Sequence, residues 1–370
     1  MIDTVKLIVP FSGRPEWITR FRQLNTLDAA SGVSRTNINP SSSYKKAGIY
    51  LPRLTYIERP NKEIGRTYQL AIEVSLPKLI FGNNFSEVAE ANLDLITQKL
   101  SEVLRATYNI WILPDTLAGS DVGRIDYCKN IIFNDYTPVS TIVGSMRTAD
   151  ISKTYDVQKT DFKNGGHIWH VHTNSLDAAM YDKVADLKQE KVSPKRSHED
   201  NGYAQMNLLD VLEASKSVSV ARYEVRLNSV RKIRAELNAV GFFGGITFRE
   251  LYSINLARKV LLKHWNNVFT KIPKALLDTD TPEQLLLNIT KANPDIKARE
   301  ALAIMGMRLL TNGADERYTR NMLEGLFTPS QYRRLKQKGR EPPKPTQLRT
   351  LLEVTNTLTA MKPINIEDYW

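Results

Sequence analysis

The chain has 370 residues, 42% of them hydrophobic, which is typical of a folded protein of about two domains. Its formal net charge of +11 favours a polyanionic partner, nucleic acid before membrane. The single cysteine, Cys128, excludes an internal disulfide and a cysteine-rich zinc site and is typical of a reducing cytoplasm. The start, MIDTVKLIVPF, is not typical of a signal peptide, and no stretch of about 18 apolar residues predicts a membrane span.

Two segments near the N-terminus alternate between apolar and polar residues, as half-buried strands do. They cover residues 3–9 and 68–76, and Pro77 ends the second one. Between them, residues 11–43 are irregular, with a loop expected at the serine-rich end. Residues 87–104 have apolar side chains at three- and four-residue spacing, which predicts an amphipathic helix.

Further strands are predicted in the middle of the chain. Residues 122–133 and 220–227 alternate in the same way, whereas residues 137–145 are predicted as a shorter strand or a turn. The polar faces of the two clear strands carry Arg124, Asp126 and Cys128, and Arg222, Glu224 and Arg226.

The stretch HIWHVHTNSLDAAMYDK, residues 167–183, predicts a β-hairpin. A loop of two or four residues centred on Asn174-Ser175 would put Tyr181 on the face of His170 and His172, with Lys183 beside it. A loop of three or five residues would put it on the other face. The pairs predicted for the even loop are 172 with 177, 170 with 179, and 168 with 181.

Imidazoles, a phenol and an ammonium on one face suit attack on a phosphate. Tyr181 would be the nucleophile, a metal the Lewis acid, and Lys183 a charge for the phosphate oxygens. The structural alternative is that Tyr181 is present because tyrosine is favoured in β-strands, and that the two histidines are part of a polar surface.

The open face of the predicted sheet collects titratable side chains, because helices cover the opposite face. These side chains are Glu73, Asp126, His170, His172, Tyr181, Lys183 and Glu224. Acidic residues are disfavoured at the centres of β-strands, so carboxylates in three strands predict a shared Mg²⁺ or Mn²⁺ site. The two histidines would favour manganese as the metal. The alternative is a set of surface ion pairs with Arg124, Arg222 and Arg226.

After residue 227 the pattern becomes helical, and a domain boundary is predicted near residues 240–245. Asp280 or Thr281 can cap one helix, with Pro282 in its first position. The predicted helices are 229–240, 248–269, 281–292, 296–312, 319–326 and 329–338, with a short helix at 206–214 after a charged loop at 188–202. A basic tract then offers contacts to DNA phosphates, or else a solvated surface. It contains Arg333, Arg334, Lys336, Lys338, Arg340, Lys344 and Arg349. The first four of these are predicted DNA contacts, together with Arg222 and Arg226 of the strand at 220–227.

Five segments, in this order and spacing, resemble the gene II/X family, the replication initiators of filamentous bacteriophages and related plasmids. The resemblance covers most of residues 1–240 and continues weakly through residues 301–320. The segments are MIDTVKLIVPF at the start, IEVSLPKLIFGNN at 72–84, GRID at 123–126, AMYDKVADL at 179–187 and VARYEVRL at 220–227.

The resemblance implies a metal-dependent, strand-specific endonuclease for rolling-circle replication in the cytoplasm of a bacterial host. Such enzymes nick one strand of a supercoiled origin, keep the 5′ phosphate on a tyrosine, and later rejoin the displaced strand. Host helicase and polymerase are implied partners. By position, Tyr181 matches the nucleophile, Lys183 its neighbouring lysine, and Glu73, Asp126 and Glu224 the family's acids, while Asp186 stands where the phage proteins carry Glu.

The motif His170-Val171-His172 resembles the metal-binding His-X-His of the wider HUH endonuclease superfamily, in which the tyrosine usually follows on a helix further downstream. The predicted metal site is therefore mixed, with Asp126 and Glu224 ahead of the two histidines. The resemblance implies an α+β fold in residues 1–240, an antiparallel sheet with helices on one face as in HUH/RRM-like nucleases. Residues 241–370 would form an all-α DNA-binding or accessory region.

Two other functions stay open at this point. The chain could be an origin-binding or partition-type protein without chemistry, in which Tyr181 merely packs, or a metal phosphodiesterase that uses water and leaves no covalent adduct. A tyrosine recombinase is disfavoured, because no His-X-X-Arg box accompanies a late tyrosine.

Overall fold

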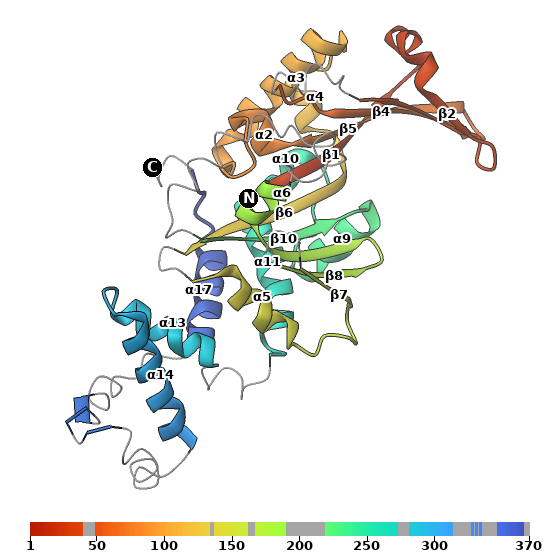
Figure 1. Ribbon diagram of the computed structural model, residues 1–370. Coiled ribbons are helices and arrows are strands. Elements are labelled where there is room, and N and C mark those ends of the chain that lie inside the picture. Colours follow the sequence, from red (N-terminus) through yellow and green to blue (C-terminus); the bar gives the residue numbers. More distant parts are fainter. Residues whose placement is uncertain are drawn as a thin grey trace.

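The computed structural model describes residues 1–39, 49–133, 137–161, 167–189, 219–272, 281–313, 327–328, 330–331, 333–334 and 346–365. Within these residues the fold is α+β, built on one ten-stranded sheet (Figure 1). Its strand order is β2-β3-β4-β5-β1-β6-β10-β9-β8-β7, and each neighbouring pair is antiparallel. None of the described helices is long and apolar enough to cross a membrane.

The predicted strands are present, except for the shorter strand or turn at 137–145. They are β1 (Ile2–Phe11), β5 (Gly65–Ser75), β6 (Asp121–Phe133), β8 (His167–Thr173), β9 (Leu176–Asp182) and β10 (Ser219–Leu227). In each of the long strands the apolar side chains face the buried side, so the period-two alternation gave the correct faces. The chain also forms β2 (Asn25–Asp28), β3 (Val33–Ile38), β4 (Arg53–Asn61) and β7 (Asp156–Asp161), which were not predicted.

The prediction of irregular structure at residues 11–43 was wrong. This segment contains the 3-10 helix η1 (Glu16–Leu24) and the hairpin of β2 and β3. The buried side of β3 includes Ser34 and Thr36, whose hydroxyls donate to Asn25 Oδ1. Buried hydroxyls give no apolar alternation, which is why the pattern was missed.

The helices of the described residues are α2 (Leu76–Phe81), η2 (Glu90–Asn92), α3 (Leu93–Tyr108), α4 (Pro114–Ala118), α5 (Val139–Arg147), α6 (Lys183–Gln189), α9 (Val230–Ala239), α10 (Phe248–Leu251), α11 (Ile254–Phe269), α13 (Pro282–Ala292), α14 (Ala298–Gly313) and α17 (Thr346–Ala360). Thr281 caps α13 through a capping box with Gln284, as predicted. The predicted helix at 248–269 is divided, because Tyr252 has a non-helical backbone.

The predicted strand or turn at 137–145 is instead helix α5. Its β-branched residues suggest a strand, but Val139, Ile142, Val143 and Met146 recur at helical spacing and are buried in the core. Helix α17 was not predicted. The short helix at 206–214, the helix at 319–326, most of the helix at 329–338, and residues 190–202 of the charged loop lie outside the described residues.

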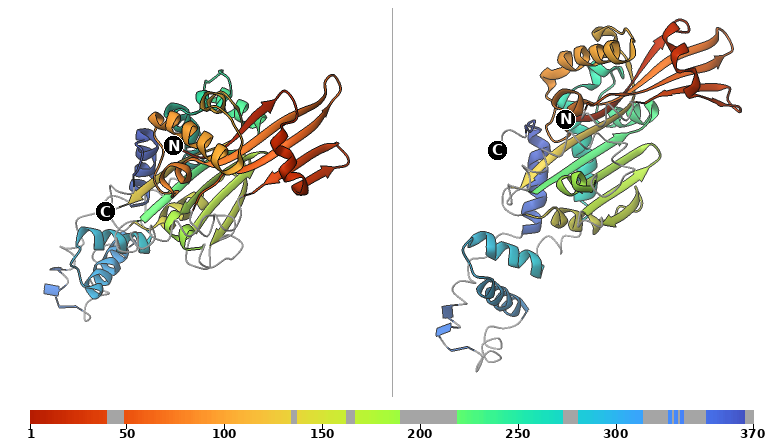
Figure 2. Two further views of the ribbon diagram at one scale, coloured as in Figure 1. Left: turned by 90° about the horizontal axis from the view of Figure 1, so that it is seen from above. Right: turned by 45° about the horizontal axis from the view of Figure 1, so that its top comes forward.

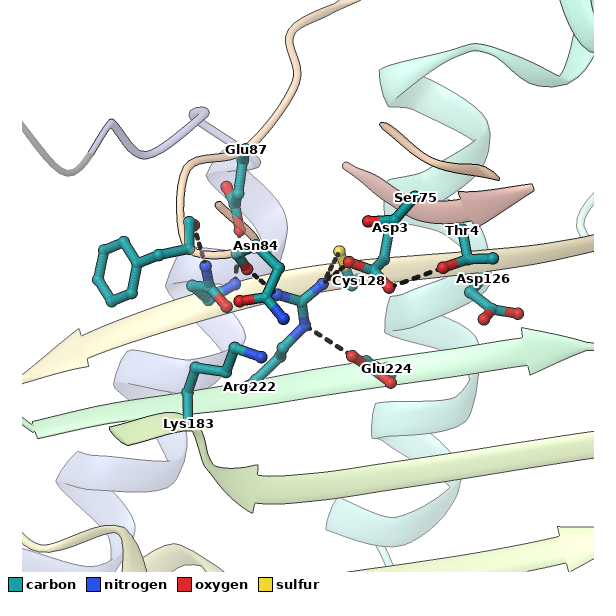
Figure 3. Close-up of polar contacts among 12 residues, drawn as sticks. Asp3, Thr4, Ser75, Asn84, Glu87, Asp126, Cys128, Lys183, Arg222 and Glu224 are labelled. Carbon is teal, nitrogen blue, oxygen red and sulfur yellow. Dashed lines mark hydrogen bonds and ion pairs between the residues drawn. The ribbon is translucent and has the colours of Figure 1, made fainter. Parts of the chain in front are cut away.

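One hydrophobic core joins the sheet to helices from both ends of the chain. It includes side chains of α3, α5 and α9, and also of α11 and α17, so it crosses the boundary predicted near residues 240–245. Helices α13 and α14 have a smaller cluster of their own. In Figure 3, α11 and α17 lie behind the strands, and the polar side chains of the site lie in front. The sheet end formed by β2 to β5 extends away from these helices (Figures 1 and 2).

Candidate active site

The β8–β9 hairpin has the predicted even loop, with Asn174 and Ser175 in the turn. His172 pairs with Asp177, His170 with Ala179, and Ile168 with Tyr181. Tyr181 therefore shares the face of His170 and His172, as the register predicted.

Tyr181 contacts a carboxylate on the neighbouring strand. Its Oη donates a hydrogen bond of 2.7 Å to Glu224 Oε1, and the residue is 8% exposed. Burial, followed by the nearby Glu224 charge, raises the pKa of Tyr181 well above 10. At neutral pH the hydroxyl is thus protonated, with a carboxylate positioned to accept its proton.

Glu224 is the most heavily paired carboxylate of this face. Arg226 donates to its Oε2 at 2.5 and 3.1 Å, and Arg222 Nε lies 2.6 Å from its Oε1 as an ion pair without hydrogen-bond alignment. Burial would raise the pKa of Glu224, but Arg226, Arg222 and the Tyr181 hydroxyl outweigh it and hold the pKa well below its usual range. The carboxylate is therefore ionised and a weak base as it stands.

Asp126 lies on β6, the strand next to β10. Arg124 forms a bidentate pair with it at 3.0 and 2.7 Å, and the residue is 3% exposed. Glu73 is 3.8 Å from the same guanidinium and is more exposed than Asp126. The three predicted acids thus face one side of the sheet, but arginines separate them.

Lys183 and Arg222 are buried beside this row (Figure 3). Lys183 Nζ is 3.4 Å from Asp186 Oδ2 and 5.8 Å from the centroid of the Tyr181 ring, and burial lowers its pKa. Arg222 donates at 2.6 Å to both the Asn84 carbonyl and Asp3 Oδ1. It is 1% exposed, so the prediction that Arg222 contacts DNA directly does not hold in this structure.

The two histidines lie apart from the carboxylate row. Their rings stack at 5.8 Å, and His170 Nε2 is 3.3 Å from Asp177 Oδ1. Strand β9 separates β8 from β10, which puts His170 about 10 Å from Glu224 across two strand spacings. The predicted mixed ligand set is not brought together.

The described residues contain no group of three or more His, Cys, Asp or Glu side chains arranged to hold a metal ion. The oxygens of Asp126 and Glu224 are instead taken up by guanidinium groups. In this arrangement the predicted ligands do not fit a divalent cation, which would have to displace Arg124 or Arg226. The requirement for Mg²⁺ or Mn²⁺ stays a prediction of the sequence.

We therefore expect the protein alone to bind Mn²⁺ weakly, because a cation must compete with two bidentate or charge-assisted arginine pairs. In an electron paramagnetic resonance titration, the signal of free Mn²⁺ should fall little when the chain is added. The double variant Arg124→Ala/Arg226→Ala should lower that signal more, while Arg249→Ala, an exposed arginine paired with Asp115, should not. Tight binding by the unmodified chain would contradict this.

A pH dependence is expected at Asp126. Burial outweighs Arg124 and raises the pKa of Asp126 from 3.8 to about 6, so the folded chain gains stability as the pH falls from 6 toward 3.8. Asp126→Asn cannot titrate and should lose this gain, about 1.4 kcal/mol for each pH unit in that window. Urea unfolding measures the free energy of unfolding of both chains at about pH 5 and about pH 7. The value for the variant, relative to that for the unmodified chain, should be higher at about pH 7 than at about pH 5. An equal difference at both values would refute the assignment.

The other predicted DNA contacts differ in accessibility. The Arg226 side chain is 36% exposed although it pairs with Glu224. Arg333, Arg334 and Arg349 are exposed, whereas Lys336, Lys338, Arg340 and Lys344 lie outside the described residues. Contact of this tract with DNA stays a prediction.

Sequence reasoning missed the loop that closes one end of the site. Glu87 binds the buried Lys129 through Oε2 and the Asn130 backbone N–H through Oε1 at 2.6 Å, and Asn130 Nδ2 donates to the Phe85 carbonyl. The available signal was Lys129-Asn130, two polar residues inside an otherwise apolar strand end.

Comparisons with protein-family models, with curated proteins and with solved structures found no match for this chain. The functional interpretation of the site therefore depends on its geometry and on the resemblance of its sequence segments.

Proposed function

We propose that this chain is a rolling-circle replication initiator that nicks one DNA strand through a 5′-phosphotyrosine on Tyr181 and later rejoins it. The observation that carries the proposal is the 2.7 Å hydrogen bond from Tyr181 to Glu224, on the polar face of the sheet and beside the buried Lys183. The residues in contact are those that match the family's nucleophile, acid and lysine. The antiparallel sheet is compatible with an HUH/RRM-like nuclease core, which belongs to the same proposal.

The chemistry is a transesterification. Tyr181 Oη forms a bond to phosphorus while the bond from phosphorus to the 3′ oxygen breaks, and the phenolic proton passes to Glu224 Oε1. The departing 3′ oxygen takes a proton from the Lys183 ammonium, for which a lowered pKa is suitable. The reverse reaction, attack of a 3′ hydroxyl on the phosphotyrosine, closes the strand without ATP.

Substrate binding would also activate the base. Arg226 is part-exposed and able to bind a phosphate oxygen, and in doing so it would leave Glu224. Because Arg226 is the strongest charge holding down the pKa of Glu224, its departure makes Glu224 a better acceptor for the Tyr181 proton. Proton transfer is thus linked to the presence of the phosphate.

The test is to trap the covalent intermediate. The chain is incubated with a labelled supercoiled plasmid carrying a candidate origin, with Mg²⁺ or Mn²⁺ and in parallel with chelator. After nuclease digestion, a nucleotide attached to the peptide that contains Tyr181 supports the proposal. Nicking without an adduct would point to a water-using phosphodiesterase, and binding without nicking to an origin-binding protein; either result overturns it.

A further inference from the structure

The polar face that carries Tyr181 continues across the sheet into the extended end formed by β1, β5, β4 and β3. Directly paired residues share a face, so the register identifies the side chains on it. In the strand register, Lys6 lies opposite Arg124 on one side and Glu73 on the other, and Glu73 lies opposite Arg53. One row of side chains therefore runs from β6 to β4.

Two more arginines lie on the same face, further along β3 and β4 than Arg53. Arg35 on β3 pairs with Ile57, whose other partner is Gln69, and Arg59 on β4 pairs with Thr67. Arg35, Arg53 and Arg59 are all exposed. With Lys6, they make up what we call the arginine track. The acids on this face are Asp3 of β1, which pairs with Arg222, Glu73 of β5 and Asp28 of β2.

The other face of these strands has a different character. There Leu54, Tyr56 and Glu58 are buried, and Trp17 of η1 packs edge-to-face on Tyr56 at 5.6 Å. Its arginines, Arg14 and Arg66, both pair with Glu58 at 3.1 Å. Arg14 and Arg66 are thus exposed but share one carboxylate, whereas Lys6, Arg35, Arg53 and Arg59 give the face that leads to Tyr181 more positive than negative charge.

We propose that the arginine track binds the backbone of the single DNA strand on which Tyr181 acts. From β10 to Arg53 on β4 there are four strand spacings, about 19 Å across the sheet, and from there the track continues along β4 and β3 to Arg59 and Arg35. Between the arginines stand Asn37 and Gln69, whose amide groups can donate hydrogen bonds to phosphate oxygens, and Thr55, whose hydroxyl donates to Asn37 Oδ1. Backbone contacts position a strand without reading its sequence, so the track holds DNA of any sequence. This inference rests on the proposed function.

The first experiment removes the positive charge from the track. The variant Arg35→Gln/Arg53→Gln/Arg59→Gln is compared with Arg20→Gln/Lys99→Gln/Arg105→Gln, which removes the same charge from exposed positions on η1 and α3, on the helical side. Binding of a fluorescein-labelled oligothymidylate that spans the track is followed by anisotropy at several salt concentrations. Losing three phosphate contacts should reduce the slope of log affinity against log salt by about 2. An unchanged slope, or an equal loss in the control, overturns the proposal.

A second experiment does not need the arginines to be changed. Cys128 is buried, so a cysteine introduced on the surface is the reactive one. Asn37→Cys on the track and Glu102→Cys on α3 are each labelled with a photo-crosslinker and irradiated with the same oligonucleotide. Cross-linking by the first and not the second supports the track, and the reverse overturns it.

Both experiments can be carried out in the Tyr181→Phe background, because they measure binding and not cleavage. If no covalent adduct formed but the track contributed to DNA binding, only the nicking mechanism would be refuted. If the adduct formed but the track made no contribution to DNA binding, only the proposal of the track would be refuted.

Discussion

Replacing Tyr181 with Phe is expected to abolish the covalent protein–DNA adduct and nicking while DNA binding continues. The substitution removes only the hydroxyl that would attack phosphorus, and loss of a nucleophile costs several orders of magnitude in rate. Stability should fall by about 1 to 2 kcal/mol, because a hydrogen bond to a charged partner is lost but Glu224 keeps Arg222 and Arg226. Denaturing gels of nuclease-treated reactions measure the adduct, and urea unfolding measures the stability.

Tyr223 provides the matched control for this substitution. It is the neighbour of Arg222 and Glu224 on β10, fully buried on the opposite face, and its hydroxyl has no hydrogen-bond partner among the described residues. Tyr223→Phe also removes one hydroxyl from a buried tyrosine, on the strand next to that of Tyr181, and should leave adduct formation unchanged. If Tyr181→Phe still formed the adduct, or Tyr223→Phe lost it, Tyr181 would not be the nucleophile.

Glu224→Ala is expected to have the largest effect on folding, a loss of about 3 to 5 kcal/mol in the free energy of unfolding. The carboxylate is 3% exposed and contacts Arg222, Arg226 and the Tyr181 hydroxyl. Removing one partner of a buried ion pair leaves the remaining charge uncompensated, and Arg222 is almost completely buried. Thermal and urea unfolding at neutral pH measure the loss.

Glu73→Ala is the comparison, since it makes the same change on the same face. The Glu73 side chain is 29% exposed and its ion pair with Arg124 spans 3.8 Å, so the cost should stay below about 0.5 kcal/mol. Equal costs at the two positions would contradict this account of the site.

The contribution of Glu224 to stability should also depend on pH. Its pKa is depressed in the folded chain, so its stabilising effect is present above its ordinary pKa of 4.5 and is lost as the pH falls toward the folded pKa.

The parts of the fold that the sequence predicted well have a local signal. In β5 and β10, and in β6 apart from the buried Lys129, every second side chain is apolar and buried. The two-residue turn at Asn174-Ser175 set the register of β8 with β9. The predictions failed where the local signal conflicts with packing. Helix α5 is rich in β-branched residues but has a core on one side, and β3 buries hydroxyls instead of apolar groups.

The sequence by itself determined which side chains share a face, because alternation along a strand is a local property of the chain. It placed Tyr181, Asp126, Glu224 and the histidines on the polar face, and in the structure they lie there. Only the tertiary structure decided which of them touch. Strand β10 is inserted between β6 and β9, so Glu224 reaches Tyr181 while the histidines lie beyond β9. Strand order arises from pairing between segments far apart in the chain, and no local pattern encodes it.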